Sequence, residues 1–388
     1  MKLASRMDRL GTETAFEVLA KAKKLEAEGK EIIHLEIGEP DFDTPSNIVE
    51  AGRSALSNGY THYGPSPGLM EVRETIAQEV RETRGIDVSG ENVVITPGAK
   101  PIMFFVIMAL IDAGDEVLYP NPGFPIYESM INFVGGVPVP MELSMDLNFD
   151  IDLDKVVESI TPKTKMIIVN SPNNPCGSIV SQSALKKLSE LASENNIIVL
   201  SDEIYRRFLY GGDFQSISSF NGMTDRTIIL DGLSKTYAMT GWRIGYGVMP
   251  IGLVESISKL STNSVSCTAS FTQIAAAEAI TGSQERALEI VEEFDRRRHI
   301  IVNGLNSING INCPMPDGAF YVFPSIKDTG MDSRVFADKL LQDFGVASLA
   351  GESFGEFGKG HLRFSFANSV ENIEKALEKI NQFVQSSS

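Results

Sequence analysis

Residues 232–243 read GLSKTYAMTGWR, and they closely follow the apolar run TIIL at 227–230. This succession of an apolar run and a polar segment is the part of the sequence that says most about the fold. The apolar run is typical of a buried β-strand, so we expect Lys235 where a strand ends, and open α/β sheets bind ligands at that edge. A lysine amine there can form a Schiff base with an aldehyde once burial or a neighbouring cation has lowered its pKa. Arg243 can hold a phosphate through its planar fork. Because most such residues are simply exposed, the two positions indicate a cofactor anchor only if other motifs agree.

Similar runs of Val and Ile recur along the chain and alternate with helical patterns. They lie at residues 92–95, 116–119, 166–169 and 197–200. Nearly continuous apolar strands suit a mostly parallel sheet that helices cover on both faces. We therefore expect an α/β fold with a mostly parallel sheet in an α/β/α sandwich.

The pattern changes towards the end of the chain. We expect a long charged helix around residues 285–301, followed by strand-like aromatic runs at 320–323 and 362–366. A helix at 14–28, with Gly29 as its C-cap, has no sheet of its own and is expected to pack on this second unit.

These patterns predict two domains. A large domain over residues 47–290 would carry the parallel sheet, and a smaller α+β domain would be assembled from residues 1–46 and 291–388. The sequence has no internal repeat and no flexible linker, so we expect the two domains to be closely joined.

Composition and charge exclude several classes of protein. The 388 residues are 43% hydrophobic and 22% charged, a balance typical of globular proteins. The net charge of −17 argues against non-specific binding to nucleic acid or to an anionic membrane. The longest apolar helix candidate, residues 101–111, is shorter than the roughly 20 residues that span a bilayer. Since the first residues also lack the apolar run of a secretory signal, we expect a cytoplasmic protein. The spacing of the cysteines does not indicate a metal site.

A second strand is followed by a possible phosphate site. Gly98 and Ala99 stand between the strand at 92–95 and the apolar helix that Pro101 opens. Unpaired N–H groups and the helix dipole favour an anion at such a position, and glycine lets a phosphate approach the backbone. Most strand-to-helix turns bind nothing, so this motif is weak by itself.

Polar side chains follow two other predicted strands. Asp202 and Tyr205 come after the strand at 197–200, and Asn174 lies in a turn-forming stretch after the strand at 166–169. An aspartate beside a pyridine nitrogen keeps it protonated, and Tyr205 or Asn174 could hydrogen-bond a phenolic oxygen of the same ring. A helical turn beginning at Asp202 would place it on one face with Tyr205. A helix N-cap, a packing tyrosine and an ordinary turn are the simpler interpretations.

In this order along the chain, the motifs resemble those of class I/II aminotransferases of fold type I, in the branch with bacterial aspartate aminotransferases. Enzymes of that family depend on pyridoxal 5′-phosphate (PLP), and the resemblance covers nearly the whole chain. It implies that Lys235 is the Schiff-base lysine and the proton-transfer base. It also implies that Asp202 pairs with the pyridinium nitrogen, while Tyr205 and Asn174 contact the phenolic oxygen.

The resemblance implies further contacts with the cofactor phosphate and ring, at Gly98, Ala99, Lys100, Phe124, Ser234 and Arg243. Arg363, in the run LRFS, would clamp the substrate α-carboxylate through a bidentate pair, and Gly38 and Asn174 would lie beside the substrate. Tyr63 matches a tyrosine that reaches the phosphate of the neighbouring subunit, which implies a homodimer with shared active sites. Taken alone, Phe124 would be a core residue and Arg363 a solvated side chain.

Lys100 bears on the substrate. The resemblance implies that a lysine in this loop helps to bind the distal carboxylate of a dicarboxylic amino acid, although the side chain could also point into solvent. We therefore expect ping-pong transfer from aspartate or another acidic amino acid to a 2-oxo acid such as 2-oxoglutarate. Residues 264–268 of the partner subunit could complete the pocket, and none of them can be assigned individually.

Two alternatives have the same active-site residues: specificity for aromatic or other neutral amino acids, and β-lyase or oxidase chemistry. A non-catalytic regulator would need a DNA-binding extension that these 388 residues do not contain. A nucleotide-binding dehydrogenase would need a G-x-G-x-x-G turn, and the strand-to-helix turns of this sequence lack one.

Overall fold

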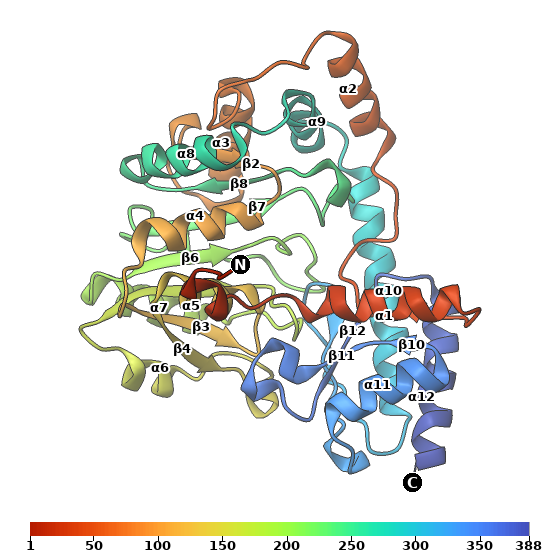
Figure 1. The fold of residues 1–388 in the computed structure, drawn as a ribbon. Coiled ribbons are helices and arrows are strands. Elements are labelled where there is room, and N and C mark those ends of the chain that lie inside the picture. The colour runs from red at the N-terminus through yellow and green to blue at the C-terminus, as the bar shows by residue number, and fades with distance from the viewer. Residues whose placement is uncertain (388) are drawn as a thin grey trace.

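The computed structural model describes residues 1–387 and is organised around a seven-stranded sheet (Figure 1). In order across the sheet, the strands are β2 (Val93–Thr96), β8 (Gly245–Val248), β7 (Thr227–Gly232), β6 (Ile198–Asp202), β5 (Thr164–Asn170), β3 (Glu116–Asn121) and β4 (Val137–Glu142). Strand β8 runs antiparallel to both of its neighbours, and the other neighbouring pairs are parallel. The prediction of a mostly parallel sheet is confirmed.

Two strands of this sheet, β4 and β8, escaped the sequence patterns because neither is a simple Val- and Ile-rich run. Strand β4 contains two prolines and lies at the edge of the sheet, where a residue without an N–H is tolerated. Strand β8 begins at Gly245, where an added Cβ would lie 2.3 Å from the backbone nitrogen of Ala99. Glycine at this position lets the loop after β2 pass directly beside β8.

Helices cover both faces of the sheet. One face is packed by α4 (Lys100–Leu110), α5 (Ile126–Val134) and α8 (Ile251–Val265). The other face is packed by α3 (Met70–Arg84), α6 (Leu153–Ser159), α7 (Gln182–Glu194) and α9 (Ser270–Thr281), with α2 (Ser46–Ser57) against α9. Successive strand residues point to opposite faces, so Ile228 lies in one core and Ile229 in the other. The predicted α/β/α sandwich is confirmed.

Helix α4 is the apolar helix expected at 101–111, and it begins and ends one residue earlier. Its Pro101 lies in the first turn, where a missing N–H leaves no hydrogen bond unmade. Within residues 1–387, no helix combines the length and the apolar character that crossing a membrane requires.

Smaller sheets form from both ends of the chain. Strand β1 (Ile33–His34) pairs in parallel with β10 (Val346–Ala347), and an antiparallel sheet has the order β11 (Leu349–Ala350), β12 (Leu362–Ser365), β9 (Tyr321–Val322). The helices around them are α1 (Thr14–Ala27), α10 (Glu285–Asn306), α11 (Ser333–Phe344) and α12 (Val370–Ser387). Their shared core is rich in aromatic side chains, including Phe294, Phe320, Phe336, Phe364 and Phe366.

The elements of this second group lie close to their expected positions. Helix α1 ends at Ala27, and Gly29 adopts the left-handed conformation with φ at +91°. As expected, α1 packs on elements near the end of the chain: its Ala22 forms a small apolar cluster with Leu341 of α11 and Ala347 of β10. Helix α10 extends to Asn306, beyond the expected end at residue 301.

Candidate active site

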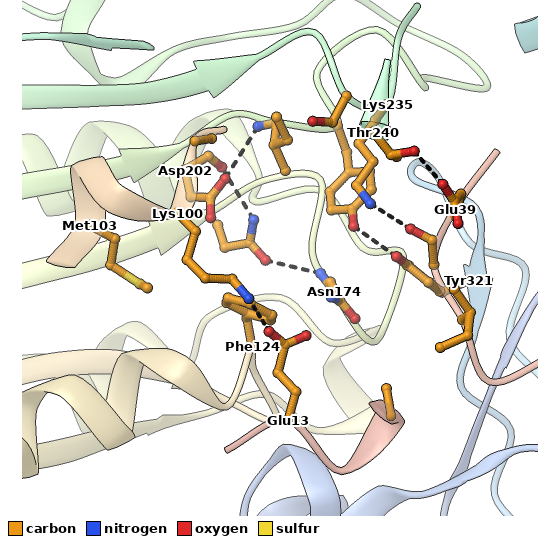
Figure 2. A pocket seen from close by; sticks show the side chains of 18 of the residues that line it. Glu13, Glu39, Lys100, Met103, Phe124, Asn174, Asp202, Lys235, Thr240 and Tyr321 are labelled. Atoms are coloured by element: carbon orange, nitrogen blue, oxygen red, sulfur yellow. Dashed lines mark hydrogen bonds and ion pairs between the residues drawn. The ribbon is translucent and has the colours of Figure 1, made fainter. Parts of the chain in front are cut away.

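A cavity of about 470 Å³ lies where β5, β6 and β7 end, and β9 and β12 of the small sheet supply its opposite wall. Most of the site residues expected from the sequence line it: Gly38, Ala99, Lys100, Phe124, Asn174, Asp202, Tyr205, Ser234, Lys235, Arg243 and Arg363. Figure 2 shows that Lys100, Asn174, Asp202 and Lys235 reach the same space from different segments. The carboxyl edge of the sheet thus gathers residues that are far apart in the sequence.

Lys235 lies three residues beyond the end of β7, as the sequence predicts. Its side chain is half-buried, and its Nζ donates a hydrogen bond of 2.5 Å to the carbonyl oxygen of Gly38. Removal from water in the cavity wall lowers the pKa of the Lys235 ammonium to about 8. The negative charges of Glu39 and Glu13 oppose this shift, and the positive charges of Arg363 and Lys100 add to it. A neutral, nucleophilic amine is therefore accessible to this lysine near physiological pH.

Asp202 is the last residue of β6 and is almost completely buried. Its Oδ2 accepts a hydrogen bond of 2.5 Å from the hydroxyl of Tyr127, and its Oδ1 accepts one of 3.3 Å from the backbone N–H of Ile204. Burial raises the pKa of Asp202 to about 6, while both hydrogen bonds act to lower it. The carboxylate is therefore ionised near neutral pH and held in one orientation.

Tyr205 differs from the expectation of a helical turn beginning at Asp202. Residues 204–207 form a hydrogen-bonded turn instead, in which the N–H of Arg206 donates to the carbonyl oxygen of Glu203 and the N–H of Phe208 to that of Tyr205. The hydroxyl of Tyr205 lies 2.7 Å from that of Tyr321, and both rings are buried. Tyr205 still lines the cavity. The turn carries its side chain there, and the hydrogen bond with Tyr321 holds the hydroxyl in place.

Arg363, in the middle of β12, is only 4% exposed. Its Nη1 donates a hydrogen bond of 3.0 Å to the side-chain oxygen of Asn174, and its Nη2 donates one to the carbonyl oxygen of Glu36. Its guanidinium carbon lies 4.5 Å from the ring centroid of Tyr321 and 4.9 Å from that of Phe354. Among residues 1–387, the buried Nε of Arg363 has no hydrogen-bond partner. A buried N–H without a partner is costly, so the Arg363 guanidinium has a hydrogen bond left to donate to a carboxylate bound beside it.

Gly98 and Arg243 meet at the start of α4. Gly98 has φ at +84°, and an added Cβ would lie 2.3 Å from the Nη2 of Arg243, so a larger residue would displace the guanidinium. Arg243 is exposed, and its Nη1 donates a hydrogen bond of 2.7 Å to the carbonyl oxygen of Thr240. With Ala99 and Ser234 on the same wall, the first N–H groups of α4 and this arginine can hold a phosphate-sized anion.

Two of the expected residues take other positions relative to the cavity. Gly98 is not among the lining residues, but it lies directly beside the guanidinium of Arg243, which lines the cavity. Tyr63 is 91% exposed and lies away from the cavity of its own chain.

Several lining residues were missed by the sequence analysis. Tyr127 lies three residues after Phe124 and was not singled out, and Tyr321 lay in a run that was assigned only as a strand. Glu13 directly precedes α1, and Glu39 follows Gly38; the carboxylate of Glu39 accepts a hydrogen bond from Thr240. The only sequence signal for these residues was their place beside a predicted motif.

The family model for "Aminotransferase class I and II" matches residues 30–380. This chain belongs to the class I and II aminotransferases. Enzymes of this family transfer amino groups and depend on PLP, so the predicted family, fold type I and class of enzyme are confirmed.

Individual relatives of this aminotransferase cover nearly all of both chains. A probable aspartate aminotransferase of Methanocaldococcus jannaschii is 44% identical over 91% of this chain and 93% of its own. Aromatic-amino-acid aminotransferase 2 of Thermococcus litoralis is 35% identical over 99% of each chain. The solved structure of aspartate aminotransferase from Thermus thermophilus with maleate is 36% identical, has a TM-score of 0.94, and covers 98% of this chain and 99% of that one.

Proposed function

We propose that this aminotransferase holds PLP in the cavity described above and moves the amino group of an acidic L-amino acid, most simply aspartate, to a 2-oxo acid such as 2-oxoglutarate. One juxtaposition carries the proposal: Lys235, whose pKa is about 8, lines the same cavity as Arg363, whose Nε has no hydrogen-bond partner among residues 1–387. The first can form a Schiff base with an aldehyde, and the second can bind a carboxylate.

The fit of PLP is supported by this chain's own atoms. The contact of Gly98 with Arg243 leaves backbone N–H groups and a guanidinium for a phosphate, with Ala99, Lys100 and Ser234 alongside. The buried, ionised carboxylate of Asp202 suits a protonated pyridine nitrogen. Phe124 would face the ring, and Tyr205 and Asn174 would hydrogen-bond its phenolic oxygen. The residues present therefore fit the cofactor.

When bound, PLP supplies an electron sink that makes the Cα–H bond of an amino acid easier to break. Lys235, released from the aldehyde, would carry the proton at its Nζ, since a pKa near 8 lets the amine both accept and return a proton. Asp202 would hold the proton on the pyridine nitrogen. Arg363 and Asn174 would orient the α-carboxylate, with Gly38 beside the substrate, so that the Cα–H bond faces Lys235.

The acidic substrate class is supported by Lys100, which also lines the cavity and can reach a second carboxylate. The relatives point the same way, because the probable Methanocaldococcus enzyme and the Thermus enzyme are both named for aspartate. Aromatic substrates are the second candidate. The 60% exposed ring of Phe16 lines the cavity beside other apolar groups, and the Thermococcus relative is named for aromatic amino acids.

We also propose the larger organisation expected from the sequence. A homodimer with shared active sites is supported by Tyr63, whose exposed ring is free to reach a neighbouring subunit's phosphate site. Residues 264–268 would complete the neighbour's pocket.

Two domains, 47–290 and the combined 1–46 and 291–388, are supported by the separation of the seven-stranded sheet from the smaller sheets. A cytoplasmic location stays a prediction.

Product analysis tests this function. Purified protein supplied with PLP, L-aspartate and 2-oxoglutarate is expected to form oxaloacetate and L-glutamate in equal amounts. L-Phenylalanine in place of aspartate tests the second candidate. An S-substituted L-cysteine, whose thiolate can leave from Cβ, tests for β-lyase chemistry: ammonia, pyruvate and the free thiol, with no glutamate formed from any donor, would contradict the proposal. Consumption of oxygen would indicate an oxidase and would also contradict it.

A further inference from the structure

The cations on the cavity wall differ in what they already contact. In the described part of the chain, the cations that line the cavity are Lys100, Lys235, Arg243 and Arg363. The proposed function assigns Lys235 to the aldehyde, Arg243 to the phosphate and Arg363 to the α-carboxylate. Lys100 is left for a substrate side chain, and its ammonium is engaged by a carboxylate of the same protein.

That carboxylate belongs to Glu13. The Nζ of Lys100 forms an ion pair with Oε1 of Glu13, and it also lies 5.4 Å from the ring centroid of Phe124 (Figure 2). The Glu13 side chain is only 17% exposed, whereas that of Lys100 is 42% exposed. Glu13 thus contacts the ammonium where a substrate's second carboxylate would have to bind.

The position of Glu13 is set by the backbone that precedes it. The N–H of Gly11 donates a hydrogen bond of 2.9 Å to the hydroxyl of Ser129 on α5, which in turn donates one of 3.1 Å to the carbonyl oxygen of Gly11. Arg9 donates hydrogen bonds to the carbonyl oxygens of Asn132 and Phe133 at 2.8 and 3.2 Å. These contacts hold the segment before α1 against α5, so Glu13 is presented to Lys100 by a fixed stretch of chain.

We propose that Glu13 is a specificity-determining residue that competes with the distal carboxylate of the substrate for Lys100. A dicarboxylate must replace Glu13 at the ammonium, and it also meets the negative charge of Glu13 as it enters. An amino acid with an apolar side chain leaves the Lys100–Glu13 pair in place and can pack beside Phe124 and Phe16, which also line the cavity. Glu13 thereby weakens the preference for acidic substrates that Lys100 alone would give. The inference rests on the proposed function, since it takes the α-carboxylate to bind at Arg363.

The test measures binding of unreactive analogues to the PLP-loaded enzyme by titration calorimetry. Succinate represents the dicarboxylic substrates, and 3-phenylpropionate represents the apolar ones. Glu13→Gln is expected to lower the Kd of succinate by about fivefold, the upper range for an exposed ion pair, while the Kd of 3-phenylpropionate changes by less than about twofold. Glu17→Gln is the matched control, because Glu17 is an exposed acid one turn further along α1. It should change neither Kd.

An unchanged or weaker affinity of Glu13→Gln for succinate would overturn the inference, as would an equal gain for both analogues or the same gain in Glu17→Gln. If Glu13→Gln does not fold, Glu13→Ala carries the same expectation. A structure of the unaltered holoenzyme with succinate is an independent check: Lys100 should contact succinate with Glu13 displaced, and an intact Lys100–Glu13 pair would contradict the inference. Failure of the proposed function is distinguishable, because the unaltered enzyme would then form no glutamate from any amino donor.

Discussion

The two ends of the cavity present positive charge in opposite ways. At the buried end, Arg363 is 4% exposed and is oriented by Asn174 and by the carbonyl oxygen of Glu36. At the exposed end, Lys100 is 42% exposed and is paired with Glu13. A buried, fully oriented guanidinium can discriminate strongly, whereas an exposed ammonium in an ion pair contributes little. The difference indicates a fixed site for the carboxylate that all amino acids share and an adjustable one for their side chains.

Lys235 lines the same cavity as Arg363 and Lys100, and its removal is expected to have the largest effect. Lys235→Ala should lower kcat by at least about a thousandfold with every amino donor, because both the amine and the proton carrier are lost. Steady-state assays measure the loss, and the absorbance of retained PLP after dialysis serves as the control for folding. Multiple turnovers of Lys235→Ala at near-normal rates would contradict the role of Lys235, and the comparison of the two ends depends on that role.

Arg363→Ala tests the buried end. We expect kcat/KM to fall by about a hundredfold or more, mainly through a higher KM, and by a similar factor for aspartate and phenylalanine. The physical reason is that both substrates lose the same α-carboxylate contact. Saturation curves for the two donors give the factors. If only aspartate were affected, Arg363 would be the side-chain site and the comparison would be reversed.

Lys100→Gln tests the exposed end. The expected result is a rise in KM for aspartate of up to about fivefold, with a much smaller change for phenylalanine, because only a dicarboxylate has a second charge to place. The measurement is the ratio of kcat/KM values for the two donors in the variant and the unaltered enzyme. A ratio that does not change would show that Lys100 takes no part in selecting the side chain.

Tyr127→Phe is expected to have the smallest effect. The hydrogen bond from Tyr127 helps to keep Asp202 ionised and lowers its pKa, so its loss should raise that pKa above about 6. Activity that requires ionised Asp202 would then fall by roughly threefold at pH 6 and recover by pH 8. The pH profiles of kcat/KM for aspartate and phenylalanine should shift together towards higher pH. A shift for one donor alone would assign Tyr127 to substrate selection.

The sequence predicted the parts of the site that follow strands. Lys235 and Asp202 each come at or just after the end of an apolar run, and a parallel sheet brings such ends to one edge. Contacts between distant segments were missed, because no local pattern encodes them. Tyr127 and Asp202 are 75 residues apart, and Glu13 and Lys100 are 87 apart. These pairs depend on where α1 and α5 are packed.

The same limit applies to the fold. Strand β4 lies at the edge of the sheet and contains two prolines. Strand β8 lies close to the backbone of a neighbouring loop and contains two glycines, so neither strand shows a continuous run of Val and Ile. The sequence allowed a helical turn after Asp202, and residues 204–207 instead form a turn closed by backbone hydrogen bonds from Arg206 to Glu203 and from Phe208 to Tyr205. The position of Asn174 after a strand indicated a possible site residue, whereas Arg363 came only from the resemblance to a known family, and spacing alone would not have placed the two together.

The central claim, that Lys235 is the covalent anchor of PLP, is tested most directly by locating the modified residue. Reducing the PLP-loaded protein with borohydride fixes the cofactor to the amine that carries it, and mass spectrometry of the proteolytic peptides then identifies that amine. We expect the added phosphopyridoxyl mass on Lys235, in the peptide that contains residues 232–243. A single stoichiometric label on another lysine, or no label on a protein that retains PLP, would contradict the account.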